Sequence, residues 1–293
     1  MVDKKVSEEV AGTTINDVDS FRAVQGGNPV RLSFSQVKQW INSWLTTGVD
    51  VSFLRGYKTG LTLANDPTDA VNDISIDIGA CASDDILDYM KLDVGLIKKS
   101  DVAWAVGTNQ GWLDTGAIGN GIYHVYLIKR IDTQVVDCIL SLNATTPLMP
   151  TGYTRKRRIG SIIRVGGTIL GFRQIGDVFK LLAVIADRNS TTVVTDTLLT
   201  LTVPTGVNVT HLGFFDCALT TAGSMIQLIG DGDNLTADTA INRIAAAGEF
   251  ATGVASQFVT NTAGQIRFTL ANSSGTPSIA RVWTVGWIDG MGR

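Results

Sequence analysis

The sequence predicts a mainly β protein, with an N-terminal segment that carries a short helix and then two β-sandwich-like (jelly-roll-like) domains. Three observations lead to this prediction. Glycine is abundant, with 31 residues, whereas proline is rare, with 6. Charged residues make up only 17% of the chain and apolar residues 44%. Many short runs of Val, Ile and Thr alternate with Gly, Asn and Asp turns, a pattern typical of sandwiches and barrels.

The first segment, residues 1–50, is expected to form a hairpin and a helix. A strand from Ser20 runs into a Gly-Gly-Asn turn, and residues 30–32 form the returning strand. Ser33 can cap the following helix, with Gln36 as the second half of a capping box. An apolar stripe at three- and four-residue spacing comprises Phe34, Val37, Ile41 and Trp44. A helix this short is only marginally stable alone, so the stripe needs a partner surface.

The first β domain is expected over residues 51–182. Alternating and β-branched runs predict strands at 60–64, 73–78, 96–99, 122–130, 135–142, 160–165 and 168–174. Residues 132–134 and the Gly166-Gly167 pair are the predicted hairpin turns, the second because both of its central residues can adopt positive φ. Residues 84–89 are expected to form a brief helix or a connection.

A shift toward Thr, Val and Ala after Leu182 marks the second predicted boundary, and residues 183–293 form the second domain. Strands are expected at 193–195, 198–203, 208–217, 225–229, 257–260, 265–270 and 280–289. In the last strand, alternation puts Val282 and Thr284 on one face, and Trp283 and Trp287 on the other. Because both faces carry large apolar groups, this strand is expected to pack inside an oligomer.

Charge and cysteine content narrow the classes of partner. The net charge of -3 argues against nucleic-acid binding, which needs a clustered basic surface. Cys81, Cys138 and Cys217 are too widely spaced for a CxxC pair, and their odd number favours folding in a reducing cytoplasm. The sequence has no secretion signal and no apolar run of membrane-spanning length, so no membrane partner is expected.

Few residues suggest catalysis, and no enzyme activity or cofactor is expected. His124 and His211 each lie inside a predicted strand, which favours a structural or surface role. The GxSxG, HExxH and P-loop patterns do not occur. Residues 84, 85 and 88 could supply the two carboxylates that glycosidic bond cleavage needs. Acidic side chains are also favoured at the start of a helix, which is a sufficient structural reason for their presence.

Two other charged stretches have two interpretations each. The run from Arg155 to Arg158 either binds an anion or forms a solvated or inter-subunit face. The loop Asp231-Gly232-Asp233-Asn234, with Asp238 nearby, offers oxygen ligands for a hard cation such as calcium, and it equally fits an Asx-rich turn.

Aromatic residues suggest a binding face. Trp104 and Trp112 flank a glycine-rich loop, and Tyr123 follows it. Aromatic rings beside Asn and Gln are typical of surfaces that contact sugars. Trp112 and Tyr123 are therefore the candidate glycan contacts, with core packing as the alternative, which is favoured for Trp104.

Two stretches resemble proteins of tailed bacteriophages. The run VSEEVAGTTINDVDSFRAVQGGNPVRLSFSQVKQWI resembles the N-terminal segment of tail-fibre and minor virion structural proteins. Residues 57–180, including AWAVGTNQGWLDTGAIGNGIYHVYLIKR and YTRKRRIGSIIRVGGTILGFRQIGDVFKL, resemble a module of phage and prophage tail proteins. In that family the N-terminal segment attaches the fibre or appendage to the virion.

The resemblance implies a structural virion component: a tail fibre, or a head, neck or tail appendage, docked to other virion proteins through its N-terminus. It also implies a homotrimer assembled in the bacterial cytoplasm and located in the virion. Two alternatives stay open: a receptor-binding module for a bacterial surface polysaccharide, and a depolymerase or esterase that trims such a glycan.

Overall fold

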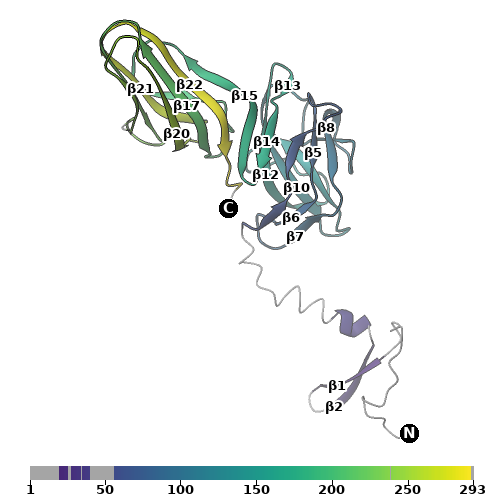
Figure 1. Cartoon of the computed structure of the whole chain (residues 1–293). Coiled ribbons are helices and arrows are strands. Elements are labelled where there is room, and N and C mark those ends of the chain that lie inside the picture. The colour runs from purple at the N-terminus through teal and green to yellow at the C-terminus, as the bar shows by residue number, and fades with distance from the viewer. Residues whose placement is uncertain (1–19, 26–27, 34, 40–55, 238, 292–293) are drawn as a thin grey trace. The chain divides into compact units, whose positions relative to one another are not determined.

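The computed structural model describes residues 20–25, 28–33, 35–39, 56–237 and 239–291. The chain divides into two compact units, Met1–Phe53 and Leu54–Arg293. Both units contain β-strands, and the described part of the chain is mainly β with a β-sandwich-like arrangement, which confirms the predicted fold class (Figure 1). No helix within the described residues has the length and apolar character that a membrane crossing requires.

The N-terminal unit contains the predicted hairpin and the start of the predicted helix. Strands β1 (Ser20–Gln25) and β2 (Asn28–Ser33) pair antiparallel, with Gln25 opposite Asn28. A helical turn follows at residues 35–39. The Gln36 N–H donates to Ser33 Oγ at 3.2 Å and the Ser33 N–H donates to Gln36 Oε1 at 2.8 Å, so the predicted capping box is confirmed. Of the predicted apolar stripe, Val37 is half-buried, and Phe34, Ile41 and Trp44 lie outside the described residues.

The second unit begins with a lobe formed by strands β3 to β14. Its strands are β3 (Lys58–Gly60), β4 (Leu63–Asn65), β5 (Asp73–Ile76), β6 (Gly79–Ala82), β7 (Tyr89–Leu92), β8 (Leu96–Ala103), β9 (Gln110–Leu113), β10 (Gly121–Arg130), β11 (Val136–Ser141), β12 (Tyr153–Val165), β13 (Thr168–Ile169) and β14 (Phe172–Ile175). Strands β3, β6 and β7 form a three-stranded sheet. The others follow the order β13-β12-β10-β11-β9-β8-β5-β4-β14 within a larger sheet. The two end strands of this order, β13 and β14, follow each other in the chain. Since β13 pairs with β12 and β14 pairs with β4, the short segment that contains β13 and β14 joins the two ends.

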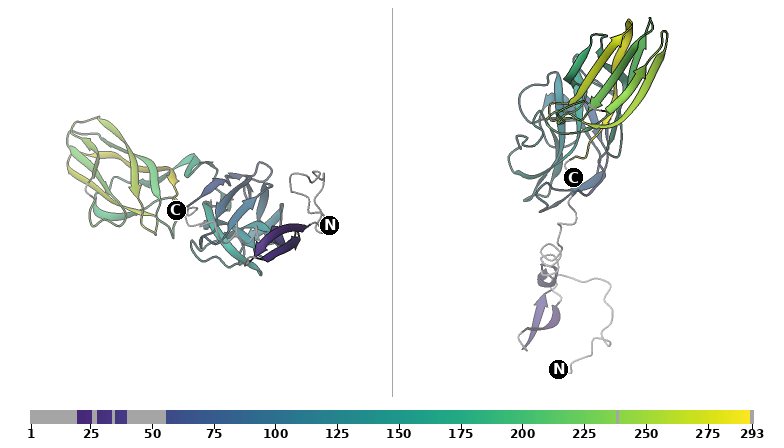
Figure 2. Two further views of the ribbon diagram at one scale, coloured as in Figure 1. Left: turned by 90° about the horizontal axis from the view of Figure 1, so that it is seen from below. Right: turned by 90° about the vertical axis from the view of Figure 1, so that its left-hand side faces the viewer.

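The second lobe is a sandwich of two sheets (Figures 1 and 2). Its strands are β15 (Val178–Asn189), β16 (Val194–Thr200), β17 (Thr210–Leu219), β18 (Ser224–Gly230), β19 (Thr239–Ile244), β20 (Phe250–Val259), β21 (Gln265–Ser274) and β22 (Pro277–Ile288). One sheet has the order β16-β21-β18-β19, and the other continues the large sheet as β15-β22-β17-β20. Buried aromatic and aliphatic side chains fill the space between them, among them Phe215, Val282 and Phe268.

Strand β15 connects the two lobes, and it corrects the predicted domain boundary between residues 182 and 183. The first residues of β15 pair with β14, as in Phe179 opposite Gln174, and its later residues pair with β22, as in Ala186 opposite Trp283. Both lobes also share one hydrophobic core, in which Phe179 and Trp287 stack with ring centroids 5.4 Å apart. The composition shift at residue 182 therefore falls inside a continuous strand of one compact unit.

The last strand, β22, has both of its neighbours in its own chain. It pairs with β15 on one side and β17 on the other. The predicted alternation is wrong beyond Thr284, because Val285 is an extra residue opposite β17 and forms a bulge. The bulge turns Trp287 into the core, whereas Trp283 is partly exposed. Both edges of this strand are therefore paired within one chain, and its inward face packs in the core.

Several local predictions are confirmed. Gly166 and Gly167 have φ of 60° and 80° between the paired strands β12 and β13. Residues 132–134 lie in the hairpin between β10 and β11. The segment 84–89 is a connection that leads into β7 and contains no helix. All three cysteines are free and buried, and burial raises the pKa of Cys81 to about 12.

Candidate functional site

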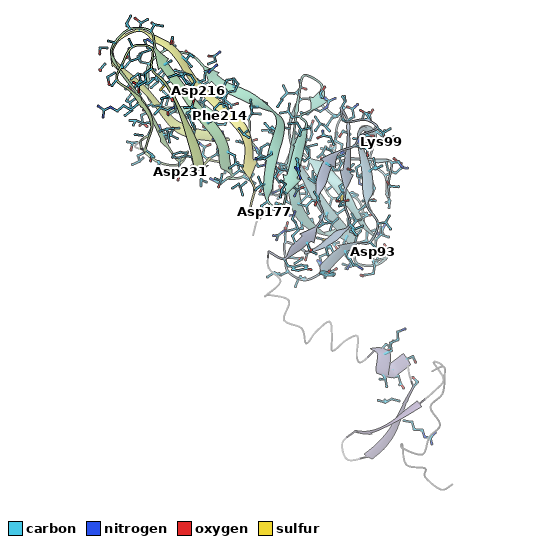
Figure 3. The ribbon with its side chains drawn as sticks, viewed as in Figure 1. Asp93, Lys99, Asp177, Phe214, Asp216 and Asp231 are labelled. Atoms are coloured by element: carbon cyan, nitrogen blue, oxygen red, sulfur yellow. The ribbon has the colours of Figure 1, made fainter. Side chains whose placement is uncertain are left out.

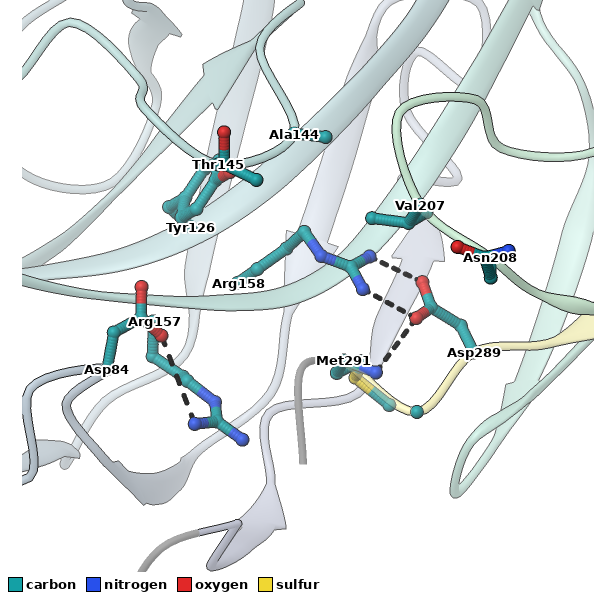
Figure 4. Close-up of a pocket in the computed structure, with 11 residues that line it drawn as sticks. Asp84, Tyr126, Ala144, Thr145, Arg157, Arg158, Val207, Asn208, Asp289 and Met291 are labelled. Carbon is teal, nitrogen blue, oxygen red and sulfur yellow. Dashed lines mark hydrogen bonds and ion pairs between the residues drawn. The ribbon is translucent and has the colours of Figure 1, made fainter. Parts of the chain in front are cut away.

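A cavity of about 530 Å³ lies where the two lobes of the second unit meet (Figure 4). This volume is within the range of small-molecule sites. Its lining comes from the connection after β6, from β10 and β12, from the loop after β11, from the loop before β17, and from the residues that follow β22: Asp84, Tyr126, Ala144, Thr145, Arg157, Arg158, Val207, Asn208, Asp289, Gly290 and Met291.

The basic run of residues 155–158 belongs to β12, and half of it is buried. Arg157 and Arg158 line the cavity and expose only a few per cent of their surface, while Arg155 and Lys156 are partly exposed. The expectation of a solvated face is therefore wrong for Arg157 and Arg158. A guanidinium that loses its water must regain hydrogen bonds or ion pairs from the protein or from a ligand.

The acidic residues of the 84–88 connection supply counter-ions to this basic strand and its neighbour. Asp84 Oδ2 lies 2.7 Å from Lys156 Nζ, and Asp85 Oδ2 lies 3.1 Å from a terminal nitrogen of Arg155. On β10, Lys129 Nζ lies 2.8 Å from the third carboxylate, that of Asp88. These ion pairs give all three carboxylates a structural role. Their position in the sequence is therefore explained without the glycosidase interpretation.

Arg158 is paired across the lobe boundary. Its two terminal nitrogens lie 2.5 and 2.7 Å from the Asp289 carboxylate oxygens, a bidentate ion pair (Figure 4). The Met291 N–H also donates to Asp289 Oδ1 at 2.8 Å. The Asp289 charge is therefore neutralised inside the protein. Sequence reasoning treated Asp289 only as the end of a strand, because its partner lies 131 positions away.

Arg157 differs from its neighbours. Its side chain is 4% exposed, and its ion-pair partner among the described residues is Asp84, whose Oδ1 lies 3.9 Å away, beyond hydrogen-bonding distance. The buried Nε of Arg157 has no hydrogen-bond partner within the described structure, a property that it shares with the Nε atoms of Arg155, Arg164, Arg188 and Arg281. Asp84 is already engaged by Lys156 at 2.7 Å. The cavity is therefore lined by a buried cation whose donors are largely unused.

The candidate glycan contacts do not reach the surface, which corrects that prediction. Trp112 is 0% exposed and its Nε1–H donates to Ser100 Oγ at 3.0 Å. Tyr123 is 2% exposed and its hydroxyl bonds to the backbone of Gly119. Trp112 lies on β9, which pairs in parallel with β8 and β11 and so packs the indole into the core. A ring enclosed in this way cannot stack on a sugar.

Both histidines are buried in strands. His124 Nδ1 lies 3.0 Å from Ser161 Oγ, and His211 Nε2 lies 2.9 Å from Thr284 Oγ1. Burial lowers the pKa of each imidazole to about 4, and the nearby Arg158 charge adds to this effect at His124. Both rings are therefore neutral at pH 7, and the His124–Ser161 pair is enclosed, since Ser161 is also fully buried.

These histidines predict a loss of stability in mild acid. The unfolded chain binds protons at a histidine pKa of about 6.5, whereas the folded chain does so only near pH 4. The free energy of unfolding should therefore fall as pH drops from about 6.5 toward 4, by up to about 1.4 kcal/mol per pH unit for each histidine. Burial raises the pKa values of Asp73 and Asp187, so these two carboxyls increase the free energy of unfolding as pH falls. Their effect opposes that of the histidines at the acidic end of the range.

Urea unfolding at about pH 7.5 and about pH 5.5 measures this dependence. His124→Gln and His211→Gln variants should each remove about half of it. Equal free energies of unfolding for the wild-type chain at both pH values would contradict the prediction.

The carboxylates of the 231–234 loop serve the local structure. Asp231 Oδ1 accepts the Val259 N–H at 2.7 Å, and the Asp231 carbonyl accepts the Asn234 N–H at 3.0 Å, as in a turn. Asp233 Oδ2 accepts a hydrogen bond from the side chain of Asn208 at 3.2 Å. Asp238 lies outside the described residues. Among the residues that are described, no three His, Cys, Asp or Glu side chains form a group that could hold a metal.

The chain was compared with proteins of known family and structure. No protein-family model, no curated protein and no solved structure matches this chain.

Proposed function

We propose that this chain is a non-enzymatic structural component of a tailed-phage virion, a tail fibre or a similar appendage, which docks through its N-terminal unit and assembles as a homotrimer. The observation that carries the proposal is the division of the chain into a hairpin-and-helix unit and a separate β body. A short capped helix gains most of its stability from packing against a partner, which suits a docking segment.

The outward face of the second lobe supports an oligomer. Phe215 and Val282 point into the core, so their neighbours Phe214 and Trp283 point outward, where their rings stack with centroids 5.5 Å apart. Figure 3 shows Phe214 on this lobe. Phe250 lies on the same face of the adjacent strand β20 and is more than half exposed. Apolar groups gathered on one sheet face favour contact with another protein surface.

A homotrimer predicts the mass of the purified full-length chain in solution. Sedimentation equilibrium should give about three times the monomer mass of 31.2 kDa. A Phe214→Ser/Phe250→Ser variant should shift the distribution toward monomer, because it removes apolar area from the outward face. The matched control is Val94→Ser, which changes an exposed apolar residue outside the second lobe. A wild-type chain that is monomeric at all concentrations would contradict the assembly.

Docking to a virion can be tested on particles from the bacterial strain that encodes this chain. Antibodies raised against the purified protein should label one fixed position on tailed particles in electron micrographs. Particles that carry no label, together with protein found only in the cell lysate, would count against a virion role.

A second candidate function is recognition of a bacterial surface glycan. The cavity beside Tyr126 favours it, because it combines aromatic, apolar and charged lining in a volume suited to a small ligand. Fluorescently labelled full-length protein should then bind host cells saturably and fail to bind polysaccharide-deficient mutants. Equal binding to both would remove this candidate.

A further inference from the structure

We infer that the cavity between the two lobes is a binding site for an oxyanion, a carboxylate or phosphate group, and that Arg157 is its principal ligand. The inference goes beyond the proposed virion role and does not depend on it, since a purified protein can bind a small anion whatever particle it belongs to.

Of the five cationic side chains at residues 129 and 155–158, four have a close carboxylate partner among the described residues and one does not. Arg155, Lys156, Arg158 and the neighbouring Lys129 each lie within 3.1 Å of a carboxylate oxygen, from Asp85, Asp84, Asp289 and Asp88 respectively. Arg157 is the fifth cation of this group, and it has to share Asp84, at 3.9 Å, with Lys156. The described residues therefore supply four carboxylates to five cations.

Burial makes this surplus charge significant. An exposed arginine would satisfy its donors with water, but the Arg157 side chain is 4% exposed and the carboxylate of its ion pair, Asp84, lies 3.9 Å away. The planar guanidinium presents several donors in a fixed fork, which matches two oxygens of a carboxylate or phosphate. A bound oxyanion would supply the hydrogen bonds that Asp84 is too far away to accept.

The acidic groups in the lining do not oppose an anion strongly. Asp289 is neutralised by the bidentate pair with Arg158 and by the Met291 N–H. Asp84 is neutralised by Lys156. Figure 4 shows the two arginines of the lining with these two carboxylates. Because both carboxylates are paired, the positive charge of Arg157 makes the cavity favour an anion.

The size of the cavity indicates the kind of molecule that carries the oxyanion. A single water occupies a share of about 30 Å³ in the liquid, so 530 Å³ has room for much more than an inorganic ion. The apolar side chains of Val207 and Met291 and the Tyr126 ring, all in the lining, suit the body of a small organic molecule. A sugar acid or sugar phosphate has this combination of charge and size, and inorganic phosphate shares only the charge.

Calorimetric titration of the full-length chain tests the inference with four probes: inorganic phosphate, glucuronate, glucose 6-phosphate and neutral glucose. We expect saturable binding of the anionic probes and none of glucose. Arg157→Gln should weaken anion binding by about 10- to 100-fold, because a hydrogen bond to a charged group is lost. Arg155→Gln is the matched control: it removes an equal charge from the same strand, at an arginine already paired with Asp85, and should leave binding within about threefold of wild type.

The outcomes separate the sources of the anion. Tighter binding of the sugar anions than of phosphate identifies an organic ligand, and equal binding identifies a site for a free oxyanion; both support the inference. No saturable binding of any anion, or equal losses in the Arg157 and Arg155 variants, would overturn it. If Arg157→Gln does not fold, NMR of the assigned arginine Nε–H signals in the wild-type chain decides: phosphate should shift the Arg157 signal, and an unchanged Arg157 signal would overturn the inference.

Discussion

Replacing Asp137 by Asn is expected to lower the free energy of unfolding by about 3–5 kcal/mol, because it breaks a fully buried ion pair. Lys98 Nζ lies 2.9 Å from Asp137 Oδ1, and the two side chains are 0% and 1% exposed. The ammonium also donates to the carbonyls of Ala105 and Gly107, and Asp137 Oδ2 accepts the Gly107 N–H at 2.7 Å. Without the carboxylate, the ammonium becomes an uncompensated charge in the core.

The chain offers a matched control for this substitution. Lys91 and Asp93 form a pair at 2.5 Å whose side chains are 61% and 69% exposed. Asp93→Asn should change the free energy of unfolding far less than Asp137→Asn does, since water screens that pair. Urea unfolding monitored by tryptophan fluorescence measures both variants. Similar small changes for Asp137→Asn and Asp93→Asn would contradict the prediction.

A double variant separates the loss of the pair from the isolated charge. Lys98→Met/Asp137→Leu should be more stable than Asp137→Asn alone, because apolar side chains often replace a buried pair at little cost. Gly107 would still lose the acceptor for its N–H, so full recovery is not expected. A double variant less stable than Asp137→Asn would show that the pair itself stabilises the loop that contains Gly107.

The second large effect is expected for Asp289→Asn, which breaks the ion pair between the lobes. Arg158 and Asp289 are both buried, and the substitution leaves the guanidinium without its counter-charge. The expected loss in the free energy of unfolding is again about 3–5 kcal/mol. Because Arg158 belongs to β12 and Asp289 follows β22, hydrogen exchange should accelerate at both places, which a local defect in one lobe would not cause.

An exposed pair of the same residue types is the control. Arg130 and Asp132 also form a bidentate pair, with distances of 3.0 and 2.6 Å, in the hairpin between β10 and β11. Asp132→Asn should lower the free energy of unfolding far less than Asp289→Asn does, because this pair is solvent-exposed. Faster exchange at β12 alone, or an effect of Asp289→Asn no larger than that of Asp132→Asn, would contradict the proposed link between the lobes.

The sequence predicts those features whose cause lies in neighbouring residues. The Gly166-Gly167 turn follows from positive φ at two adjacent positions, and the Ser33–Gln36 capping box from side chains three positions apart. Strands such as β5, β10 and β18 follow from local alternation and β-branched residues. The strands that were missed, β6, β7, β9, β15 and β19, include short and glycine-containing segments whose extended form depends on pairing with distant strands.

The candidate site could be predicted only in part. The basic run of residues 155–158 stands out in the sequence, and anion binding was one of its two interpretations, but nothing local distinguishes Arg157 from its neighbours. Lys156 and Arg158 differ from it only because Asp84 and Asp289 reach them from positions 72 and 131 residues away. The glycan prediction at Trp112 failed for the same reason, since burial of that ring depends on the strands beside β9.

The sequence by itself therefore determined the β class, the hairpin turns and the helix cap, because turn geometry, capping and alternation act over a few residues. Only the tertiary structure decided that β15 joins both lobes, that a bulge at Val285 turns Trp287 inward, and that Arg157 lines a cavity without a close counter-ion. These features depend on which distant strands become neighbours, and that order is set by the packing of the whole core.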